Sequence, residues 1–413
     1  MGQDEVVVGL DIGTTKVCAI IAELTPEGES KVVGVGISPS EGVRRGVVVD
    51  MDKTVQAIQK AVQEAELMAG LSVGAVYLGI AGEHISSLNS RGVIAVGGDQ
   101  HEIEADDKAR VIEAARAVAI PFDRQVLHVL PQEFSVDDQE GIRDPVGMCG
   151  IRLETTVHIA TAAATAVQNL TRGVERAGLR VQGICLESLA SSRAVLEEEE
   201  LEMGVCLVDV GGGTTSIAVF YQGSVRHSAV IGLGGQSLTS DIAICLRTSW
   251  SHAERIKCGW GAARAYGIGQ EEVVEVPGIA GRIPQRVARR ELASIIEARM
   301  EEIFAMVGSE LSRSGYADHL SAGVVLTGGG ALLDGAAEQA ELLLGLPVRL
   351  GAPRELPGMS EQVSGPAYAT AAGLVLMGAQ ELEAKSGGRG SGLEEEQSAS
   401  ALGRAIKWLK AQV

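Results

Sequence analysis

Two short glycine–threonine segments each follow an aspartate at the end of an apolar run. The first reads Asp11-Ile-Gly-Thr-Thr-Lys16, and the second reads Asp209-Val-Gly-Gly-Gly-Thr-Thr-Ser216. A glycine-rich turn after a strand presents backbone N–H groups that bind phosphate oxygens without side-chain charge. The preceding aspartate can hold Mg²⁺, directly or through water, and the ion then neutralises the phosphate. Either turn alone is a weak signal, but the matched pair predicts two segments that clamp a triphosphate between them.

A third glycine cluster follows the apolar run at residues 324–327. It contains Gly328, Gly329 and Gly330, and the spacing predicts a strand, a tight turn and then a helix. The N-terminus of such a helix can lie beneath a phosphate group. The alternative is an ordinary connection that needs glycines for close packing, and the sequence leaves both open.

Apolar runs of strand length alternate with helical patterns from the first residues to about 380, which predicts an α/β architecture. A first set of strands is expected at Val6–Ile12, Val17–Ala22, Lys31–Gly36 and Ala75–Ile80, with a helix at Lys53–Ala69. A second set is expected at Val205–Val210, Thr215–Phe220 and Val225–Ile231. The repeated unit of strand, aspartate, glycine turn and strand predicts two similar lobes that face each other.

Changes in composition suggest where the lobes begin and end. We expect a first lobe at 1–82 and 163–195, an inserted subdomain at 83–162 and a second lobe at 196–380. The insertion contains a charged helical stretch at 104–119 and is richer in proline. Residues 381–400 are expected to be a flexible linker, because Gly, Ser and Glu dominate its sequence and cannot build a core.

The overall charge excludes several classes of function. Lys and Arg number 35 against 54 for Asp and Glu, so the formal net charge is −19. Such a chain repels nucleic acid unless a local basic patch intervenes, and we expect no nucleic-acid partner. The six cysteines form no Cys-x-x-Cys pair, which indicates reduced thiols. We expect no secretory signal and no membrane-spanning segment, and interpret residues 362–380 as a buried segment.

Residues 401–413 contain no acidic side chain and have the pattern of a short amphipathic helix. Arg404, Lys407 and Lys410 fall opposite an apolar stripe, with Trp408 at its border. The pattern is typical of a helix that lies in a lipid interface. The expected membrane residues are Leu402, Ile406, Lys407, Trp408, Leu409 and Lys410. The alternative is that the apolar stripe docks on the protein itself or on a partner. The long tether disfavours this alternative, because docking on the protein's own core rarely requires such reach.

Arginines outnumber acidic residues between positions 282 and 299. A helix is predicted from about Gln285 to Leu311, with Leu292, Ile296 and Val307 on its buried face. The basic run predicts either a surface for an acidic partner or a solvated face with pairs of opposite charge at helical spacing.

These motifs together resemble those of the superfamily of actin, chaperone ATPases and sugar kinases, in the same order along the chain. The resemblance implies an actin-like two-lobed α/β fold with duplicated, ribonuclease H-like mixed sheets, and it implies ATP and Mg²⁺ as cofactors. Asp11 and Asp209 would organise the ion, and Glu187, in the segment 183–191, would position a water molecule. Residues 367–377 resemble the second connecting helix of that superfamily.

The resemblance also implies a set of residues that hold the nucleotide. They are Gly13, Thr14, Thr15, Lys16, Gly211, Gly212, Gly213, Thr214, Thr215, Gly235, Glu254, Lys257, Gly328, Gly329 and Gly330. Glu254 and Lys257 occupy the places that hold the ribose and the adenine. Their local alternative is a capping box, because Ser251-x-x-Glu254 has that spacing.

Within the superfamily, several segments are similar to FtsA, the bacterial actin homologue of cell division. They include Arg45-Gly-Val-Val-Val-Asp50, His128-Val-Leu-Pro-Gln-Glu-Phe134 and Ile231-Gly-Leu-Gly-Gly235. The resemblance implies a peripheral protein on the cytoplasmic face of the membrane at the division septum, with a C-terminal amphipathic helix on anionic lipid.

It also implies filaments of the protein with itself, contacts made by the inserted subdomain, and further division proteins as partners. The C-terminal peptide of FtsZ would bind the subdomain at about 238–315, with Arg286, Arg290 and Arg299 as the expected contacts. Whether ATP is hydrolysed is left open by the sequence.

Three other members of the superfamily remain as alternatives. A sugar kinase would need a catalytic aspartate in the first lobe, and it gives no reason for a tail that seeks lipid. A chaperone ATPase would need a substrate-binding domain after the second lobe, where little chain remains. A pilus-type homologue that binds the tail of a membrane protein would make residues 401–413 redundant.

Overall fold

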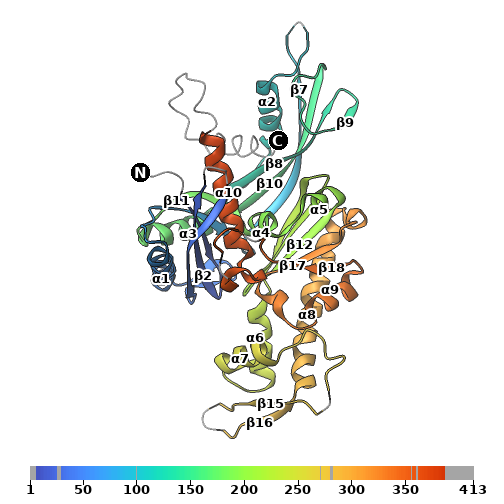
Figure 1. The fold of residues 1–413 in the computed structure, drawn as a ribbon. Helices are drawn as coiled ribbons and strands as arrows, with labels where there is room; N and C mark the ends of the chain where they lie inside the picture. Colours follow the sequence, from blue (N-terminus) through green and yellow to red (C-terminus); the bar gives the residue numbers. More distant parts are fainter. Residues whose placement is uncertain are drawn as a thin grey trace.

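The structure is a computed structural model, and it describes residues 6–25, 29–98, 100–269, 271–279, 282–354, 356–359 and 361–386. Two five-stranded sheets and a smaller inserted sheet make up most of the molecule (Figure 1). Across the parts of the chain that the structure describes, no helix is both long and apolar enough to span a bilayer.

The first lobe is built on a sheet with the strand order β11-β6-β1-β2-β3. Its strands are β1 (Val6–Ile12), β2 (Lys16–Leu24), β3 (Ser30–Pro39), β6 (Ala75–Ile80) and β11 (Arg180–Leu186). Its helices are α1 (Met51–Ala69), α3 (Ala164–Arg176), α4 (Glu187–Val195) and α10 (Ala369–Ser386), and a short hairpin joins β4 (Val43–Arg44) to β5 (Val47–Val48). The side chain of Asp50 caps the start of α1, and Gly70 ends it in the left-handed conformation.

The second lobe repeats this arrangement with the order β14-β13-β12-β17-β18. Its sheet strands are β12 (Val205–Val210), β13 (Thr215–Tyr221), β14 (Ser224–Ile231), β17 (Val324–Thr327) and β18 (Val348–Leu350). Its other elements are α5 (Glu198–Met203), α6 (Gly235–Cys245), α7 (Trp250–Trp260), β15 (Val273–Val276), β16 (Gln285–Ala288), α8 (Arg289–Ser314) and α9 (Ala336–Leu344). In both sheets an antiparallel meander of three strands is extended by parallel strands. The duplication predicted from the two aspartate turns is therefore confirmed.

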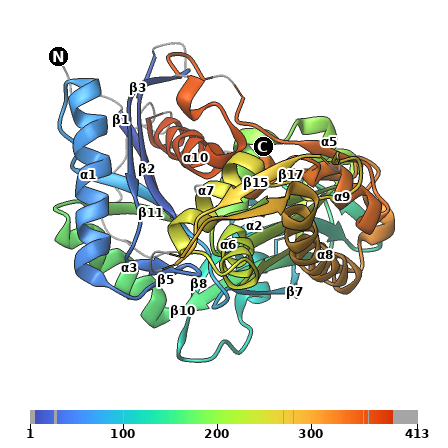
Figure 2. The same ribbon diagram turned by 90° about the horizontal axis from the view of Figure 1, so that it is seen from below.

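The expected end of the second lobe is wrong for its last segment. Helix α10 packs against β1 and α4 of the first lobe, and its residues Ala371, Ala372 and Leu374 belong to a core cluster built mostly from that lobe. A Cβ on Gly373 would collide with the carbonyl oxygen of Ala190, so glycine lets α10 and α4 touch. Figure 2 shows α10 between the first sheet and the second lobe. The apolar segment at 362–380 is a buried core segment, as predicted.

Three expected boundaries also differ. Helix α10 continues through Ser386, so the start of the expected linker at 381 is helical. Residues 285–288 form strand β16, which pairs with β15, and α8 begins only at Arg289. The third glycine cluster leads into a 3-10 turn, η2 (Gly329–Leu332), before α9 begins.

The inserted segment forms a separate sheet with the order β7-β10-β8-β9. Its elements are β7 (Ser86–Ala95), α2 (Ala105–Arg116), β8 (Arg124–Val136), β9 (Gln139–Ile142) and β10 (Arg152–Ala163). Helix α2 packs against β7 and β10 over a core that includes Val111, Phe134 and Leu153. This sheet has its own core, so the insertion is a subdomain in the physical sense.

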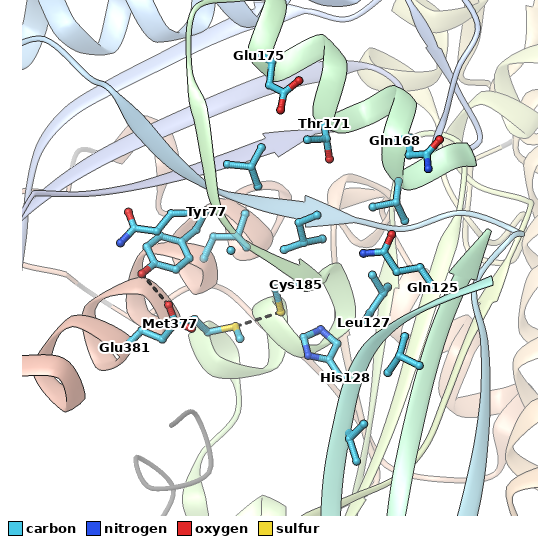
Figure 3. Close-up of a pocket in the computed structure, with 18 of the residues that line it drawn as sticks. Tyr77, Gln125, Leu127, His128, Gln168, Thr171, Glu175, Cys185, Met377 and Glu381 are labelled. Atoms are coloured by element: carbon cyan, nitrogen blue, oxygen red, sulfur yellow. Dashed lines mark hydrogen bonds between the residues drawn. The ribbon is translucent and has the colours of Figure 1, made fainter. Parts of the chain in front are cut away.

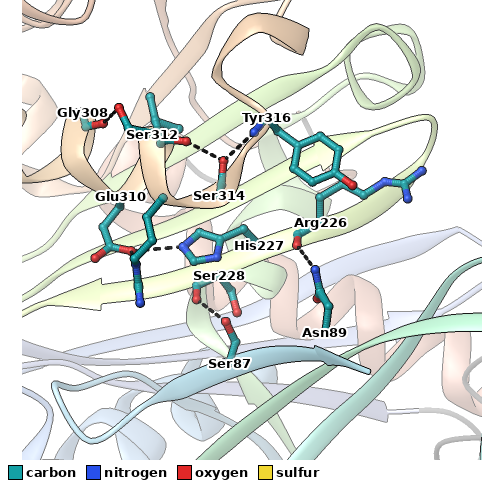
Figure 4. A network of polar contacts seen from close by, with 12 residues as sticks. Ser87, Asn89, Arg226, His227, Ser228, Gly308, Glu310, Ser312, Ser314 and Tyr316 are labelled. Atoms are coloured by element: carbon teal, nitrogen blue, oxygen red, sulfur yellow. Dashed lines mark hydrogen bonds and ion pairs between the residues drawn. The ribbon is translucent and has the colours of Figure 1, made fainter. Parts of the chain in front are cut away.

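Polar contacts join the inserted subdomain to β14 of the second lobe (Figure 4). Ser87 Oγ donates to the carbonyl oxygen of Ser228 (2.7 Å), and Asn89 Nδ2 donates to that of Arg226 (3.0 Å). His158 is buried between them, with Nδ1 2.7 Å from Asn89 Oδ1 and Nε2 2.8 Å from Ser228 Oγ. An amide oxygen only accepts, so Nδ1 donates and Nε2 accepts the serine proton, which fits a neutral imidazole.

Candidate functional site

The two glycine turns have the same geometry. Gly13 N donates to the carbonyl oxygen of Lys16 between β1 and β2, and Gly211 N donates to that of Thr214 between β12 and β13, both at 2.9 Å. Asp11 pairs in register with Cys18, just as Asp209 pairs with Ser216. Each aspartate therefore occupies the same position before a four-residue turn.

The two turns lie against each other. A Cβ on Gly213 would lie 2.5 Å from Thr14 Oγ1, and a Cβ on Gly212 would lie 2.6 Å from Thr15 Cγ2. Real Cβ atoms do not approach neighbours this closely, so the second turn needs glycines where the threonines of the first turn contact it. The structure thus brings together the two segments that the sequence predicted to meet.

Asp209 is buried and held by two hydroxyl groups. Its Oδ2 accepts from Ser191 Oγ of α4 (2.7 Å) and from Thr370 Oγ1 of α10 (3.4 Å). Burial raises the pKa of Asp209 to about 6, although the hydroxyl donors favour its charged form. Gly328, from the third glycine cluster, packs so close to Asp209 that a Cβ on Gly328 would collide with Asp209 Oδ1.

Lys16 lies between Asp11 and the start of α10. Its Nζ is 3.4 Å from Asp11 Oδ2, donates to the carbonyl oxygen of Ala367 (2.6 Å), and lies 4.9 Å from the centre of the Tyr368 ring. Burial alone would lower the pKa of Lys16, but the nearby charges, Asp11 first, raise it above its usual value. The ammonium group therefore stays charged and links the first turn to the second connecting segment.

Glu187 begins α4 and is half-buried in the same region. A Cβ on Gly79 of β6 would lie 3.2 Å from Glu187 Cγ. Burial, together with the charges of Asp11 and Asp209, raises the pKa of Glu187 well above its usual range. The site thus gathers the carboxyl groups of Asp11, Asp209 and Glu187 around Lys16.

The N-terminus of α6 docks on the second turn. Gly235 N donates to the carbonyl oxygen of Gly211 (2.9 Å), and Lys257 Nζ donates to that of Gly235 (3.0 Å) and to Glu254 Oε2 (2.8 Å). Burial would raise the pKa of Glu254, but Lys257 and Thr239 Oγ1 lower it below its usual value. The predicted residues Gly235, Glu254 and Lys257 therefore lie together beside the turn.

The capping box expected as an alternative for Glu254 does not form. Ser249, rather than Ser251, caps α7, with its Oγ accepting from His252 N (3.3 Å). The carboxylate of Glu254 is therefore directed to Lys257 and Thr239.

The third glycine cluster adjoins the second turn through β17. Thr327 pairs with Asp209 in register, and a Cβ on Gly330 would collide with Val210. Gly329 is more open, since the nearest atom to a Cβ there would be Ala367 Cβ at 4.0 Å. The cluster packs on β12, the strand that carries Asp209. This fits the alternative that its glycines serve close packing, and it also places Gly329 beside the two glycine turns.

The three arginines predicted for a partner do not form one group. Arg286 lies on β16 opposite Glu275, and Arg290 is exposed at the start of α8. Arg299 makes a bidentate contact with Asp241 of α6: Nε donates to Oδ2 (2.7 Å) and Nη2 donates to Oδ1 (3.1 Å). Arg299 also donates to Glu302. Arg299 is thus a structural link between α6 and α8.

Sequence reasoning missed Ser191, Thr370 and the Ala367 carbonyl group. Ser191 and Thr370 are also bonded to each other, at 2.9 Å. The sequence signal was weak, because Ser191 is one of three serines in α4 and Thr370 is a lone threonine near the start of α10. The six expected membrane residues, Leu402 to Lys410, lie outside the described residues.

Comparisons with known proteins fit this geometry. A family model described as cell division protein FtsA matches residues 206–373, and one described as the SHS2 domain inserted in FtsA matches residues 82–161. A Pseudomonas aeruginosa protein named cell division protein FtsA is 46% identical over 409 residues, covering 98% of each chain. The chain belongs to the FtsA family. FtsA of Neisseria meningitidis is 45% identical with 97% of both chains covered, and FtsA of Escherichia coli K12 is 41% identical with 91% and 90% covered.

Solved structures agree with the actin-like fold. The PilM–PilN type IV pilus biogenesis complex matches with a TM-score of 0.66 at 18% identity, over 90% of this chain and 98% of that one. MreB5 of Spiroplasma citri bound to ADP matches with a TM-score of 0.58 at 15% identity, over 94% and 100%. This FtsA family member is therefore an actin-like protein of cell division, and its family sets aside the sugar-kinase and chaperone alternatives.

Proposed function

We propose that the protein binds Mg·ATP between its two glycine turns, assembles into filaments on the inner membrane face and tethers FtsZ filaments there during division. The observation that carries the nucleotide part is the pair of facing turns, each preceded by a buried aspartate in the same register. Opposed turns of this kind can enclose a chain of phosphates from both sides.

The side chains present fit Mg²⁺ with a phosphate. The donors are hard carboxylate oxygens from Asp11 and Asp209, and Mg²⁺ is commonly held by one or two carboxylates plus phosphate oxygens and water. In the described residues, no group of three or more His, Cys, Asp or Glu side chains is arranged to hold a metal ion by itself. A site completed by phosphate and water is consistent with that.

Each residue then has a distinct task. The N–H groups of Gly13 and Gly211 close the two turns. The backbone N–H groups of Thr14 and Thr15 and of Gly212 to Thr214 bind phosphate oxygens, and Lys16 supplies a positive charge. Gly235, Glu254, Lys257 and the cluster at 328–330 hold the nucleoside. When bound, Mg²⁺ neutralises phosphate charge. Burial and the charges of Asp11 and Asp209 raise the pKa of Glu187, and its carboxyl group at the start of α4 is proposed to orient a water molecule by hydrogen bonding.

The attachments to lipid and to FtsZ rest on the sequence and the family. The basic amphipathic segment 401–413 binds anionic lipid weakly, and filament formation multiplies that weak anchor. The acidic FtsZ peptide binds the region that contains Arg286 and Arg290, with Arg299 holding α8 in place. The inserted subdomain contributes to contacts between subunits, and other division proteins join at the septum.

Co-sedimentation with anionic vesicles tests this proposal. The full chain with Mg·ATP should pellet with the vesicles and show filaments by negative-stain microscopy, whereas the chain ending at 400 should stay in the supernatant. The control is ATP binding by the shortened chain, which should be unchanged. Undiminished sedimentation of the shortened chain would rule out the tail as the anchor.

A further inference from the structure

A pocket of about 510 Å³ lies away from the glycine turns, where the inserted subdomain meets the first lobe (Figure 3). Strand β8 of the subdomain forms one side, and α3, β11 and α10 of the first lobe form the others. None of the predicted nucleotide residues lines it. Its volume lies within the usual range of binding pockets, which is roughly 300–1,000 Å³.

The walls of the pocket are largely apolar. They include Leu127 and Val129 of β8, Ile184 of β11, and Leu374 and Met377 of α10. The polar atoms of two wall residues are bonded to other protein atoms. His128 Nε2 accepts a hydrogen bond from Leu186 N (3.0 Å), and the Cys185 thiol donates to Met377 Sδ (3.3 Å). Such walls fit aliphatic side chains.

The remaining charged lining residues are mostly acidic. The lining contains two acidic residues, Glu175 and Glu381, and one basic residue, Arg172. Tyr77 donates its hydroxyl proton to Glu381 Oε2 (2.9 Å), which fixes this carboxylate beside the apolar wall. An occupant with an apolar stripe and flanking cations therefore matches the pocket in both polarity and charge.

The chain itself carries such a segment a short distance further along its sequence. Met377 and Glu381 line the pocket from α10, and α10 ends at Ser386, only about 7 Å further along its axis. In the sequence of residues 401–413, Leu402, Ile406 and Leu409 are spaced to share one helical face, and the charged side chains are all basic. A chain of this length between Ser386 and Leu402 reaches roughly 22 Å on average, which suffices for a return to the pocket.

We propose that segment 401–413 docks by its apolar stripe in this pocket of its own chain when no membrane is present. This inference rests on the proposed role of that segment in lipid binding. The pocket and the bilayer then compete for the same apolar face. Docking lowers the apparent affinity for lipid by the fraction of time that the tail is free, so a tail that is free one tenth of the time binds vesicles about tenfold more weakly.

Hydrogen exchange on the full chain without lipid tests docking directly. The full chain should show slower exchange in β8, β11 and α3 than the chain ending at 400, and anionic vesicles should remove that difference. Equal exchange in the two chains would overturn the proposal. Protection that increases with protein concentration would assign the tail to a second copy and overturn docking within one chain.

A variant that fills the pocket provides an independent test. Thr171→Phe places a ring in the pocket from α3, whereas Thr165→Phe makes the same change on an exposed position of α3 outside it. Thr171→Phe should raise vesicle affinity several-fold, up to about tenfold, with ATP binding as the check on folding, and Thr165→Phe should leave it unchanged. Equal vesicle affinities for both variants and the parent would contradict docking.

These two tests separate the inference from the function on which it rests. If the full chain fails to bind vesicles at all, the proposed anchor is wrong, while hydrogen exchange without lipid still decides whether the tail docks. The variant Leu409→Asp should lose the protection of the pocket, whereas Lys407→Arg should keep it, because only the first change interrupts the apolar stripe.

Discussion

At the scale of single residues, the central feature is Asp209, whose carboxylate accepts from Ser191 and Thr370. These two hydroxyl groups come from the two helices that lie between the sheets, so they fix the orientation of the carboxylate from the side of the first lobe. With a pKa of about 6, Asp209 is mostly ionised at neutral pH and available to a cation. Its position links the proposed ion site to α10.

The variant Asp209→Asn should lose the Mg²⁺ dependence of ATP affinity, because an amide has the same shape but only one neutral acceptor oxygen for the ion. We expect ATP affinity in Mg²⁺ to fall on the order of tenfold or more. Titration of a fluorescent ATP analogue with and without EDTA measures this. The control is Ser216→Ala, on β13 of the same hairpin, which should keep the dependence. Retention of the full Mg²⁺ effect by Asp209→Asn would remove this residue from the site.

The sequence predicted the aspartates and both turns because the strand, acid and glycine pattern is local and repeated. It did not predict Ser191, Thr370 or the Ala367 carbonyl group, because their contacts with Asp209 and Lys16 join segments far apart in the chain. Nor did it predict that Arg299 would be paired with Asp241, which lies on a different helix. Contacts of this kind depend on tertiary packing.

At the scale of elements, the link between α6 and α8 matters because α6 also docks on the second glycine turn. Arg299→Glu should lower the free energy of unfolding by about 1–2 kcal/mol, since it replaces a partly exposed ion pair with repulsion from Asp241 and Glu302. Urea unfolding measures this change.

Arg290→Glu, at an exposed position, should leave stability nearly unchanged and weaken FtsZ-peptide binding. The double variant Asp241→Arg/Arg299→Asp should recover stability, and failure to do so would contradict the structural role.

The interface between β10 and β14 should be sensitive to acid. Burial lowers the pKa of His158 to about 3, with His227 and His128 as nearby titrating groups. A histidine whose pKa is depressed on folding contributes stability above its unfolded pKa of roughly 6.5, and this contribution is lost as the pH falls toward the folded value.

Unfolding in urea between pH 7.5 and pH 5 should show this loss, at up to about 1.4 kcal/mol per pH unit from this group. His158→Gln keeps a donor and an acceptor but does not titrate, so its stability should fall less steeply with acid. His252→Gln, on α7, is a matched control that should follow the parent. Parallel curves for His158→Gln and the parent would contradict the assignment.

The boundaries of elements show which signals are local. Strands β1, β6 and β12 match their predicted residues, because buried strands form continuous apolar runs between turns. The start of α8 was misplaced because residues 285–288 pair with β15, a partner that a helical period cannot reveal. Helix α10 was assigned to the wrong lobe because a helix of small apolar residues does not indicate which sheet it packs on.

At the scale of the whole molecule, α4 and α10 lie between two sheets of the same topology, and both contribute to the site. Lys16 and Asp209 each bond to the segment at 366–370, so phosphate between the turns would act on the start of α10. The same helix lines the pocket between β8 and the first lobe and precedes the C-terminal segment in the sequence. The proposed nucleotide site, the two lobes and the proposed membrane segment are thus connected through one element.

A crystal structure of the full chain with Mg²⁺ and a non-hydrolysable ATP analogue tests the central claim most directly. The account predicts phosphate groups between Gly13–Lys16 and Gly211–Thr214, with Asp11 and Asp209 on the side of the ion and the base near Glu254 and Lys257. It also predicts that Thr14 and Thr15 move off the glycines of the second turn. A nucleotide bound elsewhere, or turns still in contact with no phosphate between them, would contradict it.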